Sequence, residues 1–278
     1  MTVLIATDLD RTLVYSRAAL GLTSAPLPEL TCVERRDGDQ VGFLTSVAAR
    51  QLAVLAERAV LVPVTTRLPE QLARITLPGP PPRFAVAANG GVLLDSGVPD
   101  QSWQRRVSAA VAGSISLSDV ISYVRQRCDP AWTLRVREAG GLFCYVVLAE
   151  GGAPAGFVAE AADWAASRGW SLSAQGRKLY WMPEGLTKAA AVREVADRAG
   201  AELVLAAGDS LLDRDLLCLA DRGIFPAHGE LFDTGWSAPG VQRTDAAGVL
   251  AGQEIVAWFA ARLAEFGRRA APAVTAIS

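Results

Sequence analysis

The chain has 278 residues, of which 51% are hydrophobic and 20% charged, so it can bury the core of one large domain or two smaller ones. Its formal net charge of −2 argues against a dedicated binder of nucleic-acid polymers or anionic membranes, because such proteins usually carry an excess of basic residues.

The cysteines, the single histidine and the apolar runs narrow the class of protein further. The four cysteines are widely separated, which indicates neither a disulfide framework nor a zinc site. No basic segment precedes the first apolar stretch, and no apolar run approaches the length of a membrane-spanning helix. We therefore expect a cytoplasmic protein whose cysteines are buried, reduced thiols.

The first third of the chain alternates short apolar strands with helices. Periodicity and turn signals predict strands at 3–6, 59–64 and 83–88, a hairpin over 30–44 around Asp37-Gly38, and helices at 44–58 and from 68 onward. Each of the three strands runs into polar residues at its carboxyl end. This alternation predicts an α/β fold, with a Rossmann-like doubly wound parallel sheet whose site lies at the carboxyl ends of the strands.

From about Ser102 the pattern changes to two helix-strand-strand units, which fit a four-stranded antiparallel sheet with helices on one face. We therefore expect an inserted α+β module at 102–182, within a core formed by 1–101 and 183–278. In the module we expect helices at 117–127 and 154–168 and hairpins at 132–148 and 170–182; after it, helices at 187–199, 212–220 and 246–269, strands at 203–207 and 223–225, and a loose tail at 270–278.

Two carboxylates, Asp8 and Asp10, follow the first strand two residues apart and precede the hydroxyl of Thr12. The period of two in an extended chain points both carboxylates the same way, so their repulsion needs a compensating partner. A second pair, Asp209 and Asp213, follows another apolar strand and can share one face of a helix. If both strands are central and parallel, up to four carboxylates meet at one sheet edge, which suits Mg²⁺.

Both acidic pairs also have a plain structural interpretation. The segment from Asp8 to Thr12 can be a strand end with a capped turn, and Asp209 and Asp213 can simply favour a helix N-terminus. Lysine usage favours a site, because Lys178 and Lys188 are the only lysines among the 27 basic residues. A lysine supplies a compact charge that arginine does not.

These motifs, in this order along the chain, resemble those of the haloacid-dehalogenase-like (HAD) phosphatase superfamily. The matching segments are Asp8-Leu9-Asp10-Arg11-Thr12, Thr65-Thr66-Arg67, Lys188 and Gly208-Asp209-Ser210-Leu211-Leu212-Asp213. The insert between the second and third motifs resembles the type 2 cap of subclass IIB, as in Cof-type sugar phosphatases, sucrose-phosphate phosphatase, mannosyl-3-phosphoglycerate phosphatase and phosphomannomutase. The sequence departs from the family at Thr66, where glycine is usual, and at Leu212, where asparagine is common.

The resemblance implies a role for each acidic residue. Asp8 would be the nucleophile that forms an aspartyl-phosphate, and Asp10 would be the general acid for the leaving alcohol and then the base for water. Mg²⁺ would be bound by Asp8, the backbone carbonyl of Asp10 and Asp209, with Asp213 orienting the shell around the metal.

The resemblance also implies how phosphate is held and where specificity lies. Thr65 and Lys188 would bind the transferring phosphoryl oxygens, and Thr66 and the backbone N–H groups that begin at Leu9 would complete the cradle. A cap closes over such a site and excludes water, so its exposed side chains are candidates for recognising the substrate. These candidates are Arg135, Arg137, Tyr145, Lys178 and Tyr180, although alternating exposed residues on any sheet give the same pattern.

Two core residues are further candidates for contact with the substrate or cap. Asn89 follows the third predicted strand, but Asn89-Gly90 is equally a plain turn. Arg67 can lie at the rim of the site, as can His228 and Trp181, but for each of these three we expect packing or a surface role.

The sequence therefore predicts a Mg²⁺-dependent phosphomonoester hydrolase for a small phosphorylated metabolite, either a sugar phosphate or a nucleotide-like phosphate. Two alternatives stay open at this point. One is a phosphomutase or phosphotransferase of the same fold, in which an alcohol replaces water as the acceptor, and the other is a catalytically silent ligand-binding protein. The sequence defines no oligomeric state.

Overall fold

The computed structural model of the protein describes residues 2–21 and 28–270. Its centre is a parallel sheet with the strand order β14-β13-β12-β1-β4. The first strand of the chain is therefore an interior strand, and all five of its residues are buried. The strands are β1 (Val3–Thr7), β4 (Val60–Pro63), β12 (Leu203–Ala207), β13 (Arg222–Phe225) and β14 (Val241–Arg243).

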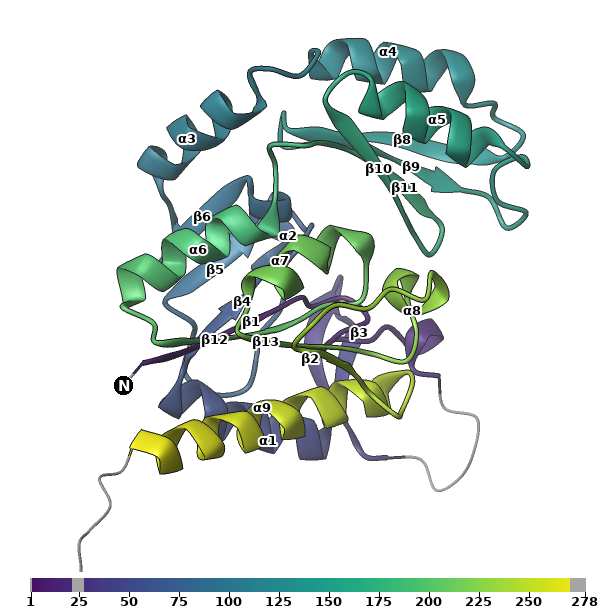
Figure 1. Ribbon diagram of the computed structural model, residues 1–278. Coiled ribbons are helices and arrows are strands. Elements are labelled where there is room, and N and C mark those ends of the chain that lie inside the picture. Colours follow the sequence, from purple (N-terminus) through teal and green to yellow (C-terminus); the bar gives the residue numbers. More distant parts are fainter. Residues whose placement is uncertain (1, 22–27, 271–278) are drawn as a thin grey trace, which may run out of the picture.

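Helices cover both faces of this sheet, as the prediction of a doubly wound α/β fold requires (Figure 1). Alternate residues of β1 point to opposite faces: Ile5 packs into the core beside α1 and α9, and Leu4 into the core beside α6 and α7. The apolar run of β1 is typical of a strand buried on both sides. The helices are α1 (Ser46–Arg58), α6 (Lys188–Ala199), α7 (Arg214–Leu219) and α9 (Val249–Ala270).

Two smaller sheets flank the core. The predicted hairpin is β2 (Leu30–Arg36) with β3 (Asp39–Thr45), and both residues of its turn have positive φ. The third predicted strand is β5 (Phe84–Ala87), but it pairs antiparallel with β6 (Val92–Asp95) and touches the parallel sheet only at one bridge. The chain reverses after β5 because residues 88–90 all adopt positive φ. β5 therefore runs parallel to the segment after β4, as predicted, but only at this one bridge, and it belongs to a separate antiparallel sheet with β6.

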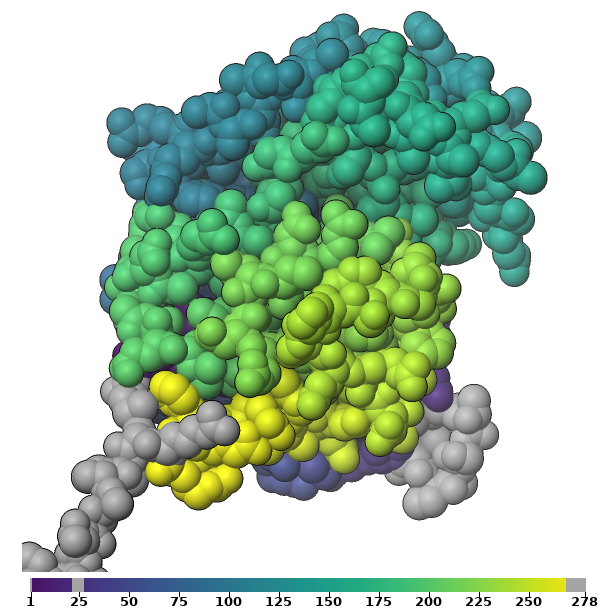
Figure 2. All heavy atoms as spheres, viewed as in Figure 1, coloured from purple at the N-terminus to yellow at the C-terminus, as the bar shows by residue number. Residues whose placement is uncertain are grey.

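The inserted module is a four-stranded antiparallel sheet with the order β10-β11-β9-β8. Its helices α4 and α5 cover the face that points away from the core, and the module sits on the core as a cap (Figures 1 and 2). The two helix-strand-strand units are as predicted. They are α4 (Leu117–Arg127), β8 (Thr133–Ala139), β9 (Phe143–Leu148), α5 (Phe157–Ala166), β10 (Trp170–Gln175) and β11 (Lys178–Pro183).

Several short elements escaped prediction because they contain too few residues for a period to be visible. A longer one, α3 (Gln101–Val111), leads into the cap and is capped by Asp100, whose side chain accepts from Trp103 N. The short ones are η1 (Arg17–Ala19), η2 (Ala88–Gly90), β7 (Val98–Pro99), η3 (Leu211–Asp213) and α8 (Glu230–Asp233). The predicted helix after residue 68 is the short α2 (Pro69–Leu72).

Several other predictions can be compared with the structure. The helix predicted from 212 begins at Arg214, after the single turn of η3. Cys144 is buried as expected, but Cys32 and Cys128 are only partly buried and Cys218 is exposed, so the prediction of four buried thiols holds for Cys144 alone. The predicted tail lies outside the described residues from 271 onward. No helix in the described ranges combines the length and apolarity needed to cross a membrane.

Thr45 joins β3, α1 and α9 and offers a test of this packing. Its Oγ1 accepts from Ala48 N at 3.1 Å as the cap of α1 and donates to Gln253 Oε1 of α9 at 2.8 Å, and the residue is 1% exposed. We expect Thr45→Ala to lower the free energy of unfolding by about 1–2 kcal/mol in urea titrations, because both hydrogen bonds are lost. Thr45→Ser keeps the hydroxyl, so an equal loss in that variant would contradict this account.

Candidate active site

The carboxyl ends of neighbouring parallel strands bring the predicted motifs to one edge of the sheet. Asp8 follows β1 and its N–H donates to Ala207 O at the end of β12, at 2.9 Å. Asp209 follows Ala207 by two residues. The strand β4 lies on the other side of β1, and Thr65 follows it by two residues. Loops after adjacent parallel strands are the usual place of a ligand site in such sheets.

Three buried carboxylates lie together at this edge. Asp8, Asp209 and Asp213 are 5%, 8% and 0% exposed, and each offers an oxygen within 4.8 Å of the others. Lys188, at the first position of α6, is 1% exposed and donates from Nζ to Asp8 Oδ1 and to Asp213 Oδ1, both at 2.6 Å. Thr12 Oγ1 donates to the other oxygen of Asp8 at 3.2 Å.

The electrostatics of this cluster indicate a missing positive charge. Burial raises the pKa of Asp8 to about 7, against the opposing charge of Lys188. Burial and the charge of Asp8 raise the pKa of Asp209 well above its ordinary value. Burial alone would lower the pKa of Lys188, but Asp213 and Asp8 hold it above its usual range. Lys188 and Arg11, whose Nε lies 3.6 Å from Asp209 Oδ2, carry two positive charges against three carboxylates. A set of oxygen donors with excess negative charge fits a hard divalent cation such as Mg²⁺.

Asp213 also shapes the loop that carries Asp209. Its Oδ2 accepts from Asp209 N, Ser210 N and Ser210 Oγ at 3.2, 3.0 and 2.8 Å. Gly208 leaves room for this arrangement, since a Cβ there would lie 2.3 Å from the Cβ of Asp213. With Oδ1 bound to Lys188, Asp213 is fully engaged by protein donors, which suits the orienting role that the resemblance implies.

Asp10 is placed apart from this cluster. Arg67 Nε and Nη2 donate to its two carboxylate oxygens, each at 2.7 Å, and Arg67 also pairs with Glu34 of β2 at 2.7 Å. The packing or surface role expected for Arg67 was therefore too modest, because Arg67 joins Asp10 and the buried Glu34 in a partly buried ion-pair network. Glu34 is 6% exposed and was missed; only its position in a predicted hairpin beside the site could have drawn attention to it.

Thr65 and Thr66 lie in the turn before Arg67. Thr65 Oγ1 accepts from Arg67 N at 3.1 Å, so its hydroxyl shapes the turn that presents Arg67. Thr66 is within hydrogen-bonding reach of Tyr180 from the cap. The segment therefore lies beneath the cap and beside Asp10, where a phosphoryl group bound at Asp8 would meet it.

The five predicted cap candidates all lie on one face of the cap sheet. In one cross-strand row, Arg137 pairs with Tyr145, Tyr145 with Tyr180, and Tyr180 with Ser173. In the neighbouring row, Arg135 pairs with Val147 and Val147 pairs with Lys178. These residues are two positions along their strands from the first row, so their side chains lie on the same face of the sheet.

This face looks toward the core. Tyr180 approaches Thr66, and Ser173 Oγ donates to Glu230 at 2.9 Å. Lys178 Nζ lies 5.4 Å from the ring centroid of Tyr145 and 5.9 Å from that of Tyr180, which is cation–π distance. The two rings and the ammonium thus form one group on the underside of the cap.

Asn89 lies away from this group. It is 2% exposed, and its Nδ2 donates to Leu186 O at 3.0 Å, in the segment by which the chain returns from the cap to the core. Its placement favours a structural contact at this linker over contact with substrate. It lies in the turn of the hairpin formed by β5 and β6, as the alternative prediction had it. This turn is tightly packed, because a Cβ on Gly90 would lie 2.2 Å from Thr187 O.

Arg11 contacts the acidic cluster, and His228 contacts the backbone of Arg11. Arg11 Nε is 3.6 Å from Asp209 Oδ2, so this motif residue, given no role from sequence, contributes positive charge beside the carboxylates. His228 Nδ1 accepts from Gly248 N at 3.1 Å, which leaves Nε2 to donate to Arg11 O at 2.8 Å. Burial lowers the pKa of His228, consistent with a neutral, structural histidine.

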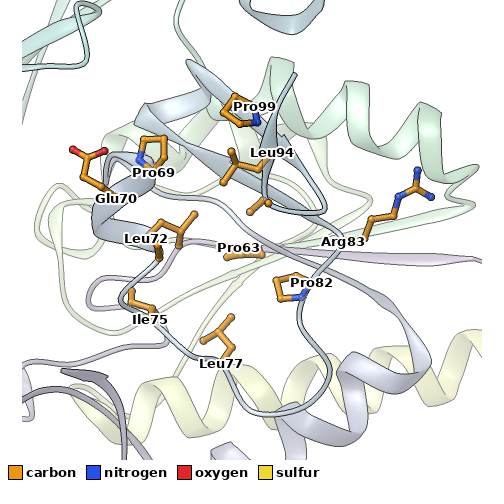
Figure 3. A pocket seen from close by; sticks show the side chains of 13 residues that line it. Pro63, Pro69, Glu70, Leu72, Ile75, Leu77, Pro82, Arg83, Leu94 and Pro99 are labelled. Atoms are coloured by element: carbon orange, nitrogen blue, oxygen red, sulfur yellow. The ribbon is translucent and has the colours of Figure 1, made fainter. Parts of the chain in front are cut away.

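A separate cavity of about 440 Å³ has a different character (Figure 3). Its lining is apolar apart from Glu70 and Arg83, and it contains none of the residues of the acidic cluster. Its lining residues are Pro63, Pro69, Glu70, Leu72, Ala73, Ile75, Leu77, Pro82, Arg83, Ala85, Leu94, Gly97 and Pro99. The candidate active site is therefore the group of carboxylates beneath the cap, which this cavity does not include.

The fold is similar to those of several solved structures of HAD superfamily phosphatases. Sucrose-phosphatase from Synechocystis, in complex with sucrose and phosphate, matches with a TM-score of 0.63 and 16% identity over 94% of this chain and 99% of the other. A HAD subclass IIB sugar phosphatase matches with a TM-score of 0.58 and 11% identity over 95% and 100%. A HAD phosphatase from Bacteroides thetaiotaomicron matches with a TM-score of 0.54 and 15% identity over 96% of each chain. No protein family and no curated protein matches the sequence itself.

We expect Mg²⁺ to stabilise the protein through the acidic cluster. At about 100 times its dissociation constant, a ligand that binds only the folded state adds about 2.7 kcal/mol, which differential scanning calorimetry detects as a rise in Tm. Asp209→Asn should remove most of this Mg²⁺-dependent rise. The matched control is Asp215→Asn, an exposed carboxylate on α7, which should keep it. An unchanged Mg²⁺ response in Asp209→Asn would contradict the proposed site.

Proposed function

We propose that the protein is a Mg²⁺-dependent phosphatase that hydrolyses the phosphate monoester of a small sugar through an aspartyl-phosphate on Asp8. The observation that carries the proposal is the buried Asp8 carboxylate, held by Lys188 next to Asp209 and Asp213, beneath a cap. The fold shared with sugar phosphatases supports the same class of reaction.

The residues around Asp8 fit attack by a carboxylate on phosphorus. A Mg²⁺ ion bound by Asp8 and Asp209 would offset the charge of the carboxylate and of the substrate's phosphoryl group. Lys188, whose Nζ already touches Asp8, is placed to hold a phosphoryl oxygen during transfer. Thr12 fixes the second oxygen of Asp8, so the carboxylate keeps one orientation.

Asp10 would move the proton. In the first step Asp8 bonds to phosphorus, the bond from phosphorus to the ester oxygen breaks, and Asp10 gives a proton to the departing alcohol. In the second step water attacks the phosphorus of the aspartyl-phosphate, Asp10 takes the proton of that water, and Asp8 and phosphate are regenerated. Asp10 must release Arg67 before it can carry a proton, and Glu34 can keep holding Arg67 meanwhile.

The departures from the family pattern leave these groups in place. Leu212 contributes no polar group, but Asp213 is oriented by the backbone of Asp209 and by Ser210. Thr66 lies beside Tyr180 and does not separate Arg67 from Asp10. These contacts favour an active enzyme over a silent ligand-binding protein.

The underside of the cap offers groups that can recognise a sugar phosphate. Tyr145 and Tyr180 offer two tilted rings 5.3 Å apart, on which the apolar face of a sugar ring can lie. Arg137 and Lys178 flank these rings and can donate to hydroxyl groups. Trehalose-6-phosphate phosphatase and its related protein are further structural neighbours, which agrees with this substrate class.

We expect Asp8→Asn to lower Mg²⁺-dependent hydrolysis of p-nitrophenyl phosphate by about a thousandfold or more, because an amide is not a nucleophile. Phosphate release is the measurement, and Asp39→Asn, at the exposed end of β3, is the control. If the wild-type protein with Mg²⁺ turned over no phosphate ester in a broad panel, the proposal would fail. It would also fail if Asp8→Asn kept its activity.

We expect Lys178→Met to raise KM for the preferred sugar phosphate about fivefold to twentyfold with a smaller change in kcat, because binding to the cap weakens while the catalytic groups stay intact. Hydrolysis of p-nitrophenyl phosphate should change little. Arg177→Met, in the adjacent turn, is the matched control. A fall in kcat with an unchanged KM would place Lys178 in the chemical step and contradict its assignment to specificity.

A further inference from the structure

Glu230 joins the cap to the core through a single carboxylate. The residue opens α8 of the core, and its Oε1 accepts from Ala174 N of the cap at 3.0 Å. Its Oε2 accepts from Ser173 Oγ of the cap at 2.9 Å and from Leu211 N of the core at 2.9 Å. Figure 1 shows α8 below the β10–β11 hairpin, so these contacts close the gap between the two parts.

On the core side, Glu230 is fixed to the loop that carries the acidic cluster. Leu211, its backbone partner, lies between Asp209 and Asp213 in the sequence. The next residue of α8, Leu231, donates from its N–H to Asp209 O at 3.1 Å. Gly229 has φ of 88°, and a Cβ there would lie 2.7 Å from both Asp209 O and Asp209 Oδ2. The helix α8 therefore packs so tightly on Asp209 that only glycine fits before Glu230.

On the cap side, Glu230 holds the row of residues that faces the site. Ser173 is 3% exposed and is the cross-strand partner of Tyr180. Tyr180 in turn lies beside Tyr145 and approaches Thr66 of the core. Any movement of the cap that breaks the contacts of Glu230 also moves these side chains away from Asp8.

The chemistry of the contact suits a reversible closure. All the partners of Glu230 are neutral donors, and within the described part of the chain no lysine or arginine pairs with it. Water can replace the two cap donors when the cap lifts, whereas separating a buried ion pair would be far more costly. Burial raises the pKa of Glu230, and the three hydrogen bonds oppose that rise.

We propose that Glu230 is a positioning residue that holds the cap closed over Asp8 and, through Leu211, couples closure to the order of the loop bearing Asp209 and Asp213. The consequence for catalysis rests on the proposed phosphatase function. The coupling itself concerns cap opening and Mg²⁺ binding, and it can be measured without turnover.

Two variants of the full chain and one control distinguish the contacts of Glu230 with the cap from its contact with the core. Glu230→Gln keeps the size of the side chain but has one acceptor oxygen, so its NH₂ group must face either Ala174 N–H or Leu211 N–H. Ser173→Ala removes a donor on the cap and leaves the Leu211 contact intact. Asp233→Asn is the matched control, because Asp233 is an exposed acid on the same helix α8.

Hydrogen exchange measured by mass spectrometry reports cap opening, and calorimetric titration with Mg²⁺ reports the acidic cluster. In Glu230→Gln we expect about tenfold faster exchange in the segment 170–175 and about threefold to tenfold weaker Mg²⁺ binding. In Ser173→Ala, which loses one of the two cap donors, we expect faster exchange in the same segment and, because closure and Mg²⁺ binding are coupled, a smaller loss of Mg²⁺ affinity than in Glu230→Gln. With an active enzyme, both variants should raise KM for glucose 6-phosphate more than they lower kcat.

Two results would overturn the proposal. One is exchange and Mg²⁺ binding in Glu230→Gln that match those of Asp233→Asn. The other is faster exchange at 170–175 with unchanged Mg²⁺ binding in Glu230→Gln. In that case Glu230 would hold the cap closed but would not couple closure to the loop bearing Asp209 and Asp213. If Glu230→Gln did not fold, Ser173→Ala would decide the closure half, and unchanged exchange there would refute it. Absence of turnover in the wild type would instead refute the proposed function.

Discussion

The two buried ion pairs of Lys188, with Asp8 and with Asp213, are the interactions on which the rest of the site depends. Lys188 touches both carboxylates at 2.6 Å and is 1% exposed, so it is cut off from water. Removing one partner of such a buried pair typically costs about 3–5 kcal/mol, because the other charge is left without compensation. Lys188 therefore makes it possible to bury two carboxylates side by side. With Asp209 and the partly exposed Arg11 beside it, the cluster keeps an excess of negative charge, which suits a divalent cation.

The fold brings these groups together from distant parts of the chain. Asp8 comes from the first strand, while Lys188 and Asp213 come from the segment after the cap. The parallel pairing of β1 with β12 fixes the edge at which the acids meet, and α6 begins at that edge with Lys188. Because the cap is inserted directly before α6, the segment that returns from the cap runs straight into Lys188, and this segment connects the cap to the site.

Much of this arrangement was predictable from the sequence. Apolar runs ending in Asp8 and Asp209 indicated strands with a common edge, and two helix-strand-strand units indicated the cap sheet; the structure agrees with both. The scarcity of lysine singled out Lys188 and Lys178. What escaped prediction depends on contacts between distant residues that no local period records. Glu34 and Glu230 are ordinary acids in the sequence, and only the folded chain places one on Arg67 and the other on the cap. The separate sheet of β5 depends on the turn at Asn89-Gly90, which the sequence offered as an alternative, but the positive φ of Ala88 has no local signal.

The central claim of this account is that Asp8 is the nucleophile. The most direct test is to quench the wild-type enzyme in acid during turnover of a phosphate ester with Mg²⁺ and to search its peptides for phosphate by mass spectrometry. The account predicts a phosphorylated peptide with the phosphate on Asp8 and no such peptide in Asp8→Asn. Steady turnover with no phosphorylated peptide, or with the phosphate on another residue, would contradict it.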